Sequence, residues 1–298
     1  MKILLFGKNG QVGWELQRSL APLGELVALD RHDKNFCGNL ANPDGLRDTV
    51  RQICPDVIVN AAAYTAVDKA ESDTVEAHAV NAEAPGVLAE AAQALGAWLV
   101  HYSTDYVFDG SGSKPWEEGD PTGPLSVYGR TKLEGEQRIA ARCTHHLILR
   151  TSWVYSARGG NFAKTMLRLA NERDSLTVIN DQFGAPTGAD LLADVTAHVL
   201  RRVQGGGSSS LAGIYHAAAA GETSWHGYAG FVINTACAAG MALKASSAAV
   251  MPVPTTAFPT PAVRPHNSRL NTARLQNTFG LQLPVWQSGV KRLLAEIT

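Results

Sequence analysis

A chain of 298 residues that is 45% hydrophobic and 18% charged can bury a full core, which excludes an intrinsically disordered protein. Its formal net charge of −1 lacks the basic excess of proteins that handle polyanionic nucleic acid, so we expect no nucleic-acid partner. The length suits one large α/β domain, or a nucleotide-binding domain that carries a smaller second lobe.

The cysteines and the N-terminus indicate a cytoplasmic protein. Cys37, Cys54, Cys143 and Cys237 form no CxxC pair and resemble no disulfide framework, so we expect reduced thiols. The first apolar run ends at Gly7, which is too short for a signal peptide. No apolar stretch is long enough to span a bilayer, so we expect no membrane partner.

Short apolar runs and amphipathic stretches alternate in the first half of the chain. We expect strands at Ile3–Phe6, Leu26–Leu29, Val57–Val59, Trp98–Tyr102 and Leu147–Leu149. We expect helices at Gln11–Leu20, Leu46–Ile53, Val75–Leu95 and Val127–Ala141. Because Pro85 has no N–H group, the third helix should kink or break there. Strands that alternate with helices predict a doubly wound, Rossmann-type parallel sheet covered on both faces.

The pattern is less regular after Arg150. We expect helices at Phe162–Asn171, Leu191–Val203, Asn271–Thr278 and Trp286–Ile297, and a strand at Gly213–His216. The glycine- and serine-rich run 205–210 is compatible with a linker or a surface loop, and the strand that follows at once favours a loop.

Three glycines stand between the first expected strand and the first expected helix. A glycine turn lets the backbone approach a pyrophosphate, and the start of the following helix offers free N–H groups and a positive dipole end. Glycines occur in many turns, but here Asp30 also ends the next strand, where an acid can bind a ribose hydroxyl. We therefore expect a dinucleotide-binding loop that includes Gly7, Gly10, Gln11, Val12 and Gly13.

Asp30 and Arg31 favour different cofactors. A carboxylate at the end of the second strand favours NADH, whereas a guanidinium can bind the 2′-phosphate of NADPH. Arg31 can equally be a solvated surface charge. The sequence therefore leaves both NADH and NADPH open.

Tyr128 and Lys132 lie four residues apart on an expected helix, so both side chains share one face. A free phenol has a pKa of about 10, and a nearby ammonium lowers it. Tyr128 can then act as a general acid on a carbonyl oxygen while a hydride reaches the carbon. Lys132 can also hydrogen-bond the nicotinamide ribose. The YxxxK spacing alone is common by chance on exposed helices.

Thr104 strengthens this interpretation. It follows the fourth expected strand, and ligands of open α/β sheets bind beyond the carboxyl ends of the strands. Its hydroxyl can orient a substrate carbonyl, although a turn bond to the backbone is the alternative. A glycine loop, a hydroxyl after a strand and a Tyr–Lys helix, in this order, indicate a nicotinamide oxidoreductase.

Seven blocks of the sequence match motifs of one family: Gly7–Gly13, Asn60–Ala63, Ser103–Phe108, Tyr128–Lys132, Arg150–Tyr155, Asn180–Thr187 and Arg264–Ser268. With them the chain resembles the extended short-chain dehydrogenases/reductases and, among these, the dTDP-4-dehydrorhamnose reductases. The resemblance covers nearly the whole chain. Its last three blocks separate this family from epimerases and dehydratases that share the Tyr–Lys pair.

The resemblance implies that NADPH or NADH reduces the C4 ketone of dTDP-4-dehydro-6-deoxy-L-mannose to give dTDP-β-L-rhamnose. This is the final step of dTDP-rhamnose biosynthesis, which supplies lipopolysaccharide O antigen. Tyr128 would be the proton donor, Lys132 its partner, and Thr104 the residue that tunes the pair. Further cofactor contacts are implied at Asp30, Asn39, Leu40, Ala62, Ala63, Tyr64 and Tyr102.

The same resemblance implies sugar contacts at Thr104, Asp105 and Trp153. Trp153 can pack its ring against the 6-deoxy sugar or can be a core tryptophan. Arg264 and His266 can meet the diphosphate, since a guanidinium suits phosphate oxygens, or can tether the proline-rich loop. Val67 is a weaker candidate at the pocket edge.

The resemblance also implies a smaller α/β C-terminal lobe that binds the nucleotide sugar. Residues 1–150 would form the NAD(P)-binding Rossmann domain, to which about 161–179 and 189–216 return. Residues 151–160, 180–188 and 217–298 would form the substrate lobe.

Some members of the family hold a divalent metal between two subunits, which implies a homodimer with a structural Mg²⁺ at Glu15, Asp190 and Glu296. Carboxylates suit such a cation. Asp190 is shorter than the glutamate expected there, and three acids far apart in sequence are also compatible with solvated surface charges.

Two other functions are compatible with the same core. The first is a nucleotide-sugar epimerase or dehydratase, but Tyr106 stands where a dehydratase would carry a glutamate after Asp105. The second is a cofactor-binding regulatory subunit of the methionine adenosyltransferase β type. Because Thr104, Tyr128 and Lys132 are all present, nothing in the sequence favours the loss of catalysis.

Overall fold

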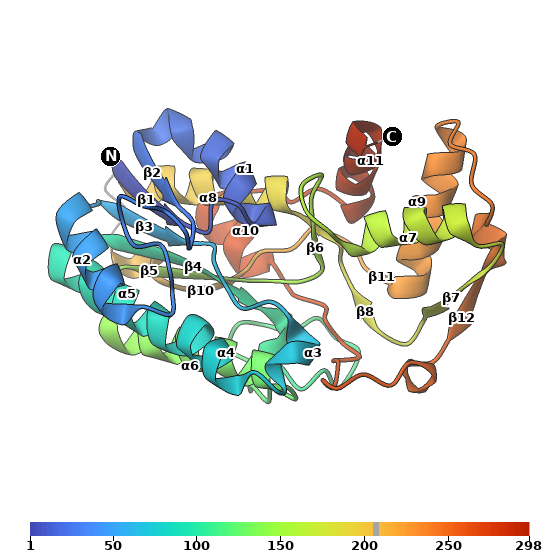
Figure 1. The fold of residues 1–298 in the computed structure, drawn as a ribbon, viewed down its shortest axis with the longest axis horizontal. Coiled ribbons are helices and arrows are strands. Elements are labelled where there is room, and N and C mark those ends of the chain that lie inside the picture. Colours follow the sequence, from blue (N-terminus) through green and yellow to red (C-terminus); the bar gives the residue numbers. More distant parts are fainter. Residues whose placement is uncertain (205–208, 298) are drawn as a thin grey trace.

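The computed structural model describes residues 1–204 and 209–297. In this part of the chain, six parallel strands form a central sheet in the order β10-β5-β4-β3-β1-β2 (Figure 1). The strand order reverses beside β1, which is where ligands of open α/β sheets bind. The strands are β1 (Lys2–Phe6), β2 (Glu25–Leu29), β3 (Val57–Asn60), β4 (Trp98–Thr104), β5 (His146–Thr151) and β10 (Gly213–His216).

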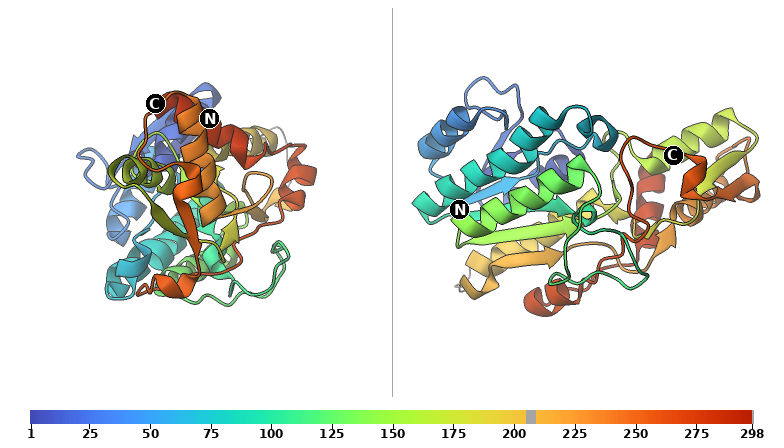
Figure 2. Two further views of the ribbon diagram at one scale, coloured as in Figure 1. Left: turned by 90° about the vertical axis from the view of Figure 1, so that its right-hand side faces the viewer. Right: turned by 90° about the horizontal axis from the view of Figure 1, so that it is seen from below.

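Helices cover both faces of this sheet (Figures 1 and 2). One face carries α1 (Gln11–Leu20), α8 (Ala189–Gln204) and α10 (Ala273–Phe279), and the other carries α2 (Pro43–Ile53), α5 (Ala84–Leu95) and α6 (Val127–Arg142). Side chains of neighbouring residues in a strand point to opposite faces of the sheet. Leu5 packs in the core beneath α1, α8 and α10, and Leu4 packs in the core beneath α2, α5 and α6. Because both faces are buried, the strands are apolar throughout. The expected Rossmann-type doubly wound sheet is confirmed.

The stretch expected as one helix over 75–95 is divided. It contains α4 (Thr74–His78), a π-helical segment η2 (Ala79–Glu83) and α5, and the short α3 (Val67–Ala70) precedes them. Pro85 lies in the first turn of α5, where its missing N–H group leaves no helix bond unmade. The break expected from this proline therefore falls just before it.

A second, smaller lobe stands beside the carboxyl ends of the sheet strands (Figure 1). Its core joins α7 (Phe162–Glu172), α9 (Trp225–Ala238) and α11 (Trp286–Ile297). Pairs of short strands complete it: β7 (Leu176–Ile179) with β12 (Val250–Val253), β8 (Phe183–Gly184) with β11 (Thr223–Ser224), and β6 (Val154–Tyr155) with β9 (Thr187–Gly188). The remaining short turns are η1 (Ala21–Leu23), η3 (Asp105–Val107), η4 (Ser209–Leu211), η5 (Ser247–Ala249) and η6 (Thr255–Ala257).

The chain crosses between the two lobes differently from the expected division. The segment 161–179 was expected in the sheet domain, but the apolar face of α7 packs on α9 in the second lobe. The segment 217–298 was expected in the second lobe throughout, but α10 packs against β10 and α8. The segment 189–216 supplies α8 and β10 to the first domain as expected, apart from 205–208, where the predicted loop lies outside the described residues.

Within the described ranges no helix is long and apolar enough to cross a membrane. All four cysteines are free thiols in the described structure.

Candidate active site

The glycine loop turns sharply between β1 and α1. Gly7 has a φ of +88°, a region that favours glycine, and a Cβ atom on Gly13 would lie 2.0 Å from the carbonyl oxygen of Gly7. The first turn of α1 contains no acidic residue, and no side chain from the described residues caps it. The N–H groups of Gln11 and Val12 therefore start a helix whose positive end suits a pyrophosphate.

Replacing Gly13 by alanine is expected to weaken NADPH binding at least ten-fold, because the loop must move to relieve the contact with Gly7. Titration of cofactor fluorescence measures this. Gly230→Ala is the matched control, since a Cβ there meets nothing within 4 Å. Equal affinities in the two variants would contradict this role for the loop.

Asp30 is held in a network of polar groups beside the loop. The side-chain amide of Asn9 donates to its carboxylate at 2.7 Å, and the backbone N–H of His32 donates at 2.7 Å. The Lys8 ammonium lies 3.6 Å from Asp30 and 2.5 Å from Asp33. The carboxylate therefore has a defined orientation, and a cation stands beside it.

The other expected cofactor residues are placed around the carboxyl ends of β2, β3 and β4. Arg31 is exposed and lies 3.5 Å from Glu76, Asn39 accepts from the backbone of Ala41, and Leu40 is buried. Ala62, Ala63 and Tyr64 follow β3 directly. The Tyr102 hydroxyl lies 2.5 Å from the Thr196 hydroxyl in the core.

Tyr128 lies in the first turn of α6, and Thr104 ends β4. The Thr104 hydroxyl donates to Asp105 at 3.1 Å and accepts from the backbone of Tyr106 at 3.2 Å. Burial raises the pKa of Tyr128 above its ordinary value, and the nearby Thr104 hydroxyl opposes that rise. The expected proton donor therefore lies near the expected hydroxyl.

Lys132 is 1% exposed, and its ammonium is held away from bulk water. Nζ donates to the carbonyl oxygen of Tyr102 at 2.6 Å and lies 3.1 Å from Nε2 of His101. Burial lowers the pKa of Lys132 to about 8, and Glu136 opposes the shift. We expected Lys132 to lower the pKa of Tyr128, but in the protein alone burial of the phenol dominates and raises it.

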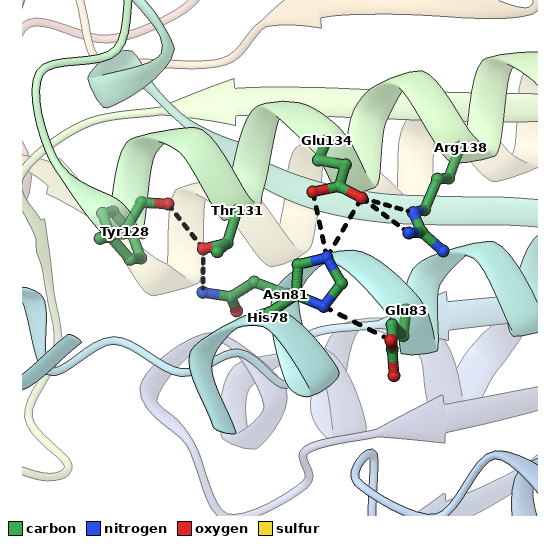
Figure 3. Close-up of polar contacts among 7 residues, drawn as sticks. All are labelled: His78, Asn81, Glu83, Tyr128, Thr131, Glu134 and Arg138. Atoms are coloured by element: carbon green, nitrogen blue, oxygen red, sulfur yellow. Dashed lines mark hydrogen bonds and ion pairs between the residues drawn. The ribbon is translucent and has the colours of Figure 1, made fainter. Parts of the chain in front are cut away.

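The start of α6 is tied to the π-helical segment that precedes α5 (Figure 3). Asn81 donates to the Thr131 hydroxyl at 3.3 Å, and that hydroxyl donates to the backbone carbonyl of Tyr128 at 3.0 Å. Asn81 also pairs twice with the backbone of Tyr64. His78, farther along the same contact, lies 3.1 Å from Glu134 of α6. A π-helical segment, which is often found at functional sites, thus links the loop after β3 to the helix that carries Tyr128.

Trp153 lies between β5 of the sheet domain and β6 of the second lobe. Its φ of +50° is uncommon for a bulky residue, and its ring stacks on Trp225 with the ring centroids 3.6 Å apart. A Cβ atom on Gly184 would lie 2.8 Å from the Trp153 ring. Gly184 lies within the Asn180–Thr187 motif but was not singled out, and Trp225 belongs to no motif that sequence reasoning used, so both partners were missed.

Asp105 follows Thr104 directly at the end of β4. It is 2% exposed, and one carboxylate oxygen has no hydrogen-bond partner among the described residues. Burial raises the pKa of Asp105 to about 6, and hydrogen bonds from Ser268 and Thr104 oppose the shift. An incompletely paired buried carboxylate costs free energy, which is typical of a functional site.

A cavity of about 510 Å³ lies between the lobes. Val67, Tyr106, Trp225 and Arg264 contribute to its wall, and so do Asp68, Phe162 and Phe258. Arg264 donates to Asp68 at 2.6 Å, while its other terminal nitrogen is buried without a partner in the described structure. His266 does not line this cavity; Nδ1 lies 2.8 Å from the carbonyl oxygen of Asp181.

Comparison with known proteins identifies the family. The model of the RmlD substrate binding domain matches residues 1–298. A dTDP-4-dehydrorhamnose reductase from Shigella flexneri is 59% identical over 297 residues, which cover 100% of this chain and 98% of that relative. The chain belongs to this family. It is therefore an NAD(P)-dependent oxidoreductase of the dTDP-4-dehydrorhamnose reductase type, as the sequence motifs implied.

Solved structures agree with this family. A dTDP-4-dehydrorhamnose reductase from Clostridium acetobutylicum is 36% identical with a TM-score of 0.89, and the match covers 100% of this chain and 99% of that one. A dTDP-4-dehydrorhamnose reductase from Bacillus anthracis, in complex with NADP, is 33% identical with a TM-score of 0.88 over 99% of both chains. These likenesses confirm the fold.

The acids expected to bind a metal in this family do not assemble in one chain. Glu15 lies 3.6 Å from Arg18, Asp190 lies 3.1 Å from Arg292, and Glu296 is exposed. Among the described residues no group of three or more His, Cys, Asp or Glu side chains could hold a metal ion. Arginine partners already neutralise two of the carboxylates, so a Mg²⁺ site is not supported.

Proposed function

We propose that this chain reduces the C4 ketone of dTDP-4-dehydro-6-deoxy-L-mannose with NADPH or NADH, and so forms dTDP-β-L-rhamnose. The observation that carries the proposal is the full-length match to reductases of that name, in a structure that places Thr104 at the carboxyl end of β4 and Tyr128 near it. We further propose that the product is used to assemble lipopolysaccharide O antigen. This part of the proposal rests on the family resemblance alone.

The residues of the chain perform the proton half of the reduction. When bound, the reduced nicotinamide supplies a hydride to C4. The Tyr128 hydroxyl donates its proton to the carbonyl oxygen, which would otherwise become an alkoxide. Thr104 orients the same oxygen and the phenol, and Lys132 holds a positive charge near the phenolate that remains. The ketone thereby gains one hydride and one proton.

Both cofactors are compatible with the acid-and-cation arrangement at the ribose site. Asp30 can accept from the ribose hydroxyls of NADH, and the NADP complex of the Bacillus anthracis relative supports NADPH. Lys8 is near enough to Asp30 to offset its charge beside a 2′-phosphate. We propose that the chain uses both.

The sugar and its diphosphate are assigned to the cavity between the lobes. Trp153, stacked on Trp225, offers an apolar surface to a 6-deoxy sugar, and Asp105 can accept from a sugar hydroxyl. The unpaired nitrogen of Arg264 suits a phosphate oxygen. Val67 contributes apolar wall, whereas His266 contacts the substrate only if its loop moves.

Replacing Trp153 by leucine is expected to raise the KM for the keto sugar roughly ten-fold, because a stacked ring contributes about 0.5–1.5 kcal/mol beyond its buried area. Cofactor affinity should not change. Trp98→Leu is the control, since Trp98 starts β4 and lies at the opposite end of the strand from Thr104. An unchanged KM in Trp153→Leu would remove this residue from the sugar site.

A substrate assay tests the proposed function. Purified protein, NADPH or NADH and the dTDP-keto sugar should lose the absorbance of the reduced nicotinamide. If cofactor binds but no keto sugar consumes it, the regulatory-subunit alternative is favoured. If the keto sugar is isomerised or dehydrated without net consumption of cofactor, the epimerase or dehydratase alternative is correct.

We also propose a homodimer in the cytoplasm, on the strength of the family resemblance. No step of the reaction uses a metal, so EDTA is expected to leave turnover unchanged. Sedimentation velocity with and without EDTA measures the oligomeric state. A loss of turnover on chelation would show that Glu15, Asp190 and Glu296 do hold an ion that the reaction needs.

A further inference from the structure

His101 is a buried imidazole that the proposed reaction does not use. It extends from β4 beneath α6 and is 1% exposed. Nε2 lies 3.1 Å from Nζ of Lys132, and Nδ1 lies 3.2 Å from the side-chain nitrogen of Asn60. Asn60, also 1% exposed, is in register with His101 on the neighbouring strand β3. The three side chains form a row from the sheet to the helix that carries Tyr128.

The hydrogen bond of Asn60 to the backbone decides which atoms of this row donate. The Asn60 side-chain oxygen accepts from the backbone N–H of Ala62 at 3.2 Å. Its NH₂ group must therefore face His101, and Nδ1 of the imidazole must accept. Burial and the charge of Lys132 hold the pKa of His101 well below its ordinary value, so the ring is neutral and carries its one proton on Nε2.

A proton on Nε2 bears directly on the charge of Lys132. An ammonium can only donate, so it cannot accept a hydrogen bond from an Nε2–H group. A neutral amine accepts that bond and still donates to the carbonyl oxygen of Tyr102. If Lys132 is charged, the imidazole proton must move to Nδ1, and the Asn60 amide must then turn its NH₂ group toward the N–H of Ala62. Protonation of Lys132 therefore requires the anchored network to rearrange, which lowers the proton affinity of the amine.

We propose that His101, held by Asn60, is a positioning residue that sets both the place and the protonation state of Lys132 through its own tautomer. The role deepens the proposed function. The ammonium that the proposed reaction uses beside Tyr128 therefore forms only when the imidazole proton lies on Nδ1.

The charged groups that face this row are few. Lys132 is the only ionisable group of the described residues that shifts the pKa of His101, and Glu136 is the only one that shifts that of Lys132. Glu136 itself pairs with Arg150 at 2.6 Å. The charge of Lys132 thus responds mainly to burial and to the hydrogen bonds of its row.

The tautomer of His101 can be measured without substrate. Nitrogen-15 and carbon-13 NMR of histidine-labelled protein distinguishes Nε2–H from Nδ1–H, and the spectrum of His101→Gln assigns the signal among the 9 histidines. We expect Nε2–H in the free enzyme at a pH above about 8, where Lys132 is neutral. An Nδ1–H signal at that pH would overturn the proposal, and this result does not depend on which substrate the enzyme reduces. If His101→Gln fails to fold, the spectrum of His101→Leu assigns the signal instead.

The pH profile of kcat/KM separates a positioning role from a structural one. His101→Gln offers Lys132 a carbonyl oxygen, and Asn60→Asp draws the imidazole proton to Nδ1. Both substitutions should stabilise the Lys132 ammonium and so move the alkaline limb of the profile to a pH about one unit higher. This shift corresponds to a roughly ten-fold higher proton affinity of Lys132. His101→Leu offers no acceptor and should move it downward.

His216→Gln is the matched control, because His216 is likewise a fully buried imidazole on the sheet but lies beside Phe108. Its profile should keep the wild-type midpoint. If His101→Gln and Asn60→Asp lose turnover without a shift of the limb, His101 is structural only and the proposal is overturned. If wild-type protein oxidises no NADPH with the keto sugar, the proposed function fails while the NMR result still decides the tautomer.

Discussion

Replacing Tyr128 by phenylalanine is expected to lower turnover by roughly a hundred-fold or more, the usual effect of removing a general acid. The change removes one oxygen atom and keeps the ring, whose edge packs against Tyr106 with the centroids 5.5 Å apart. The proton for the C4 oxygen must then come from water, which the buried end of β4 admits poorly. Cofactor binding should be nearly unchanged, because the glycine loop and Asp30 are not touched.

Steady-state kinetics with the keto sugar, together with a cofactor titration, measures both effects. Tyr106→Phe is the matched control, since it removes a phenolic hydroxyl from the neighbouring ring while leaving Thr104 and Tyr128 unchanged. A Tyr128→Phe enzyme with near-normal turnover would show that another group donates the proton. An equal loss in both variants would show that the loss comes from packing.

Replacing Glu136 by leucine is expected to destabilise the protein by about 3–5 kcal/mol, the usual cost of breaking a buried ion pair from one side. Glu136 and Arg150 are 2% and 3% exposed, and two nitrogens of the guanidinium bond its carboxylate at 2.6–3.2 Å. Leucine fills a similar volume but leaves the Arg150 charge buried without its partner. The change also removes the carboxylate that opposes the loss of charge on Lys132.

Chemical denaturation measures the free energy of unfolding of this variant. Glu172→Leu is the control: Glu172 pairs with Arg168 four residues earlier, but both side chains are largely exposed, so the loss should be no more than about 0.5 kcal/mol. Similar losses in the two variants would mean that the buried pair contributes no more than a surface one. A stable Glu136→Leu protein with altered pH dependence would separate the electrostatic role of Glu136 from its structural role.

Most elements of the sheet domain were predictable because their signals are local. Gln11–Leu20 was expected as a helix and is one, since apolar residues at helical spacing must face the sheet. The glycine loop was predictable for the same reason: its turn and its close contacts need glycine at neighbouring positions. Trp153 was predictable as a sugar contact only by resemblance, because its partner Trp225 lies in another helix of the second lobe.

The path of the chain between the lobes could not be derived in this way. The pattern of 161–179 shows that α7 is amphipathic, but many apolar surfaces satisfy such a helix, and its actual partner α9 is formed by residues more than fifty positions later. Likewise α10 has an apolar face that fits either lobe, and it is buried against β10 and α8. Burial is not directional, so periodicity predicts that a face is covered and not by which helix.

The sequence by itself determined the family and the Rossmann-type sheet, and it predicted Tyr128, Lys132 and Thr104 as the reacting group, because motif order and strand–helix periodicity are local properties of the chain. Only the tertiary structure decided the partners of these side chains. Tyr128 lies near Thr104, whereas Lys132 meets His101, 31 residues away, and the carbonyl oxygen of Tyr102. Parallel strands bring β3 and β4 side by side and place α6 over them, so Asn60, His101 and Lys132 become neighbours through packing that no spacing along the chain reveals.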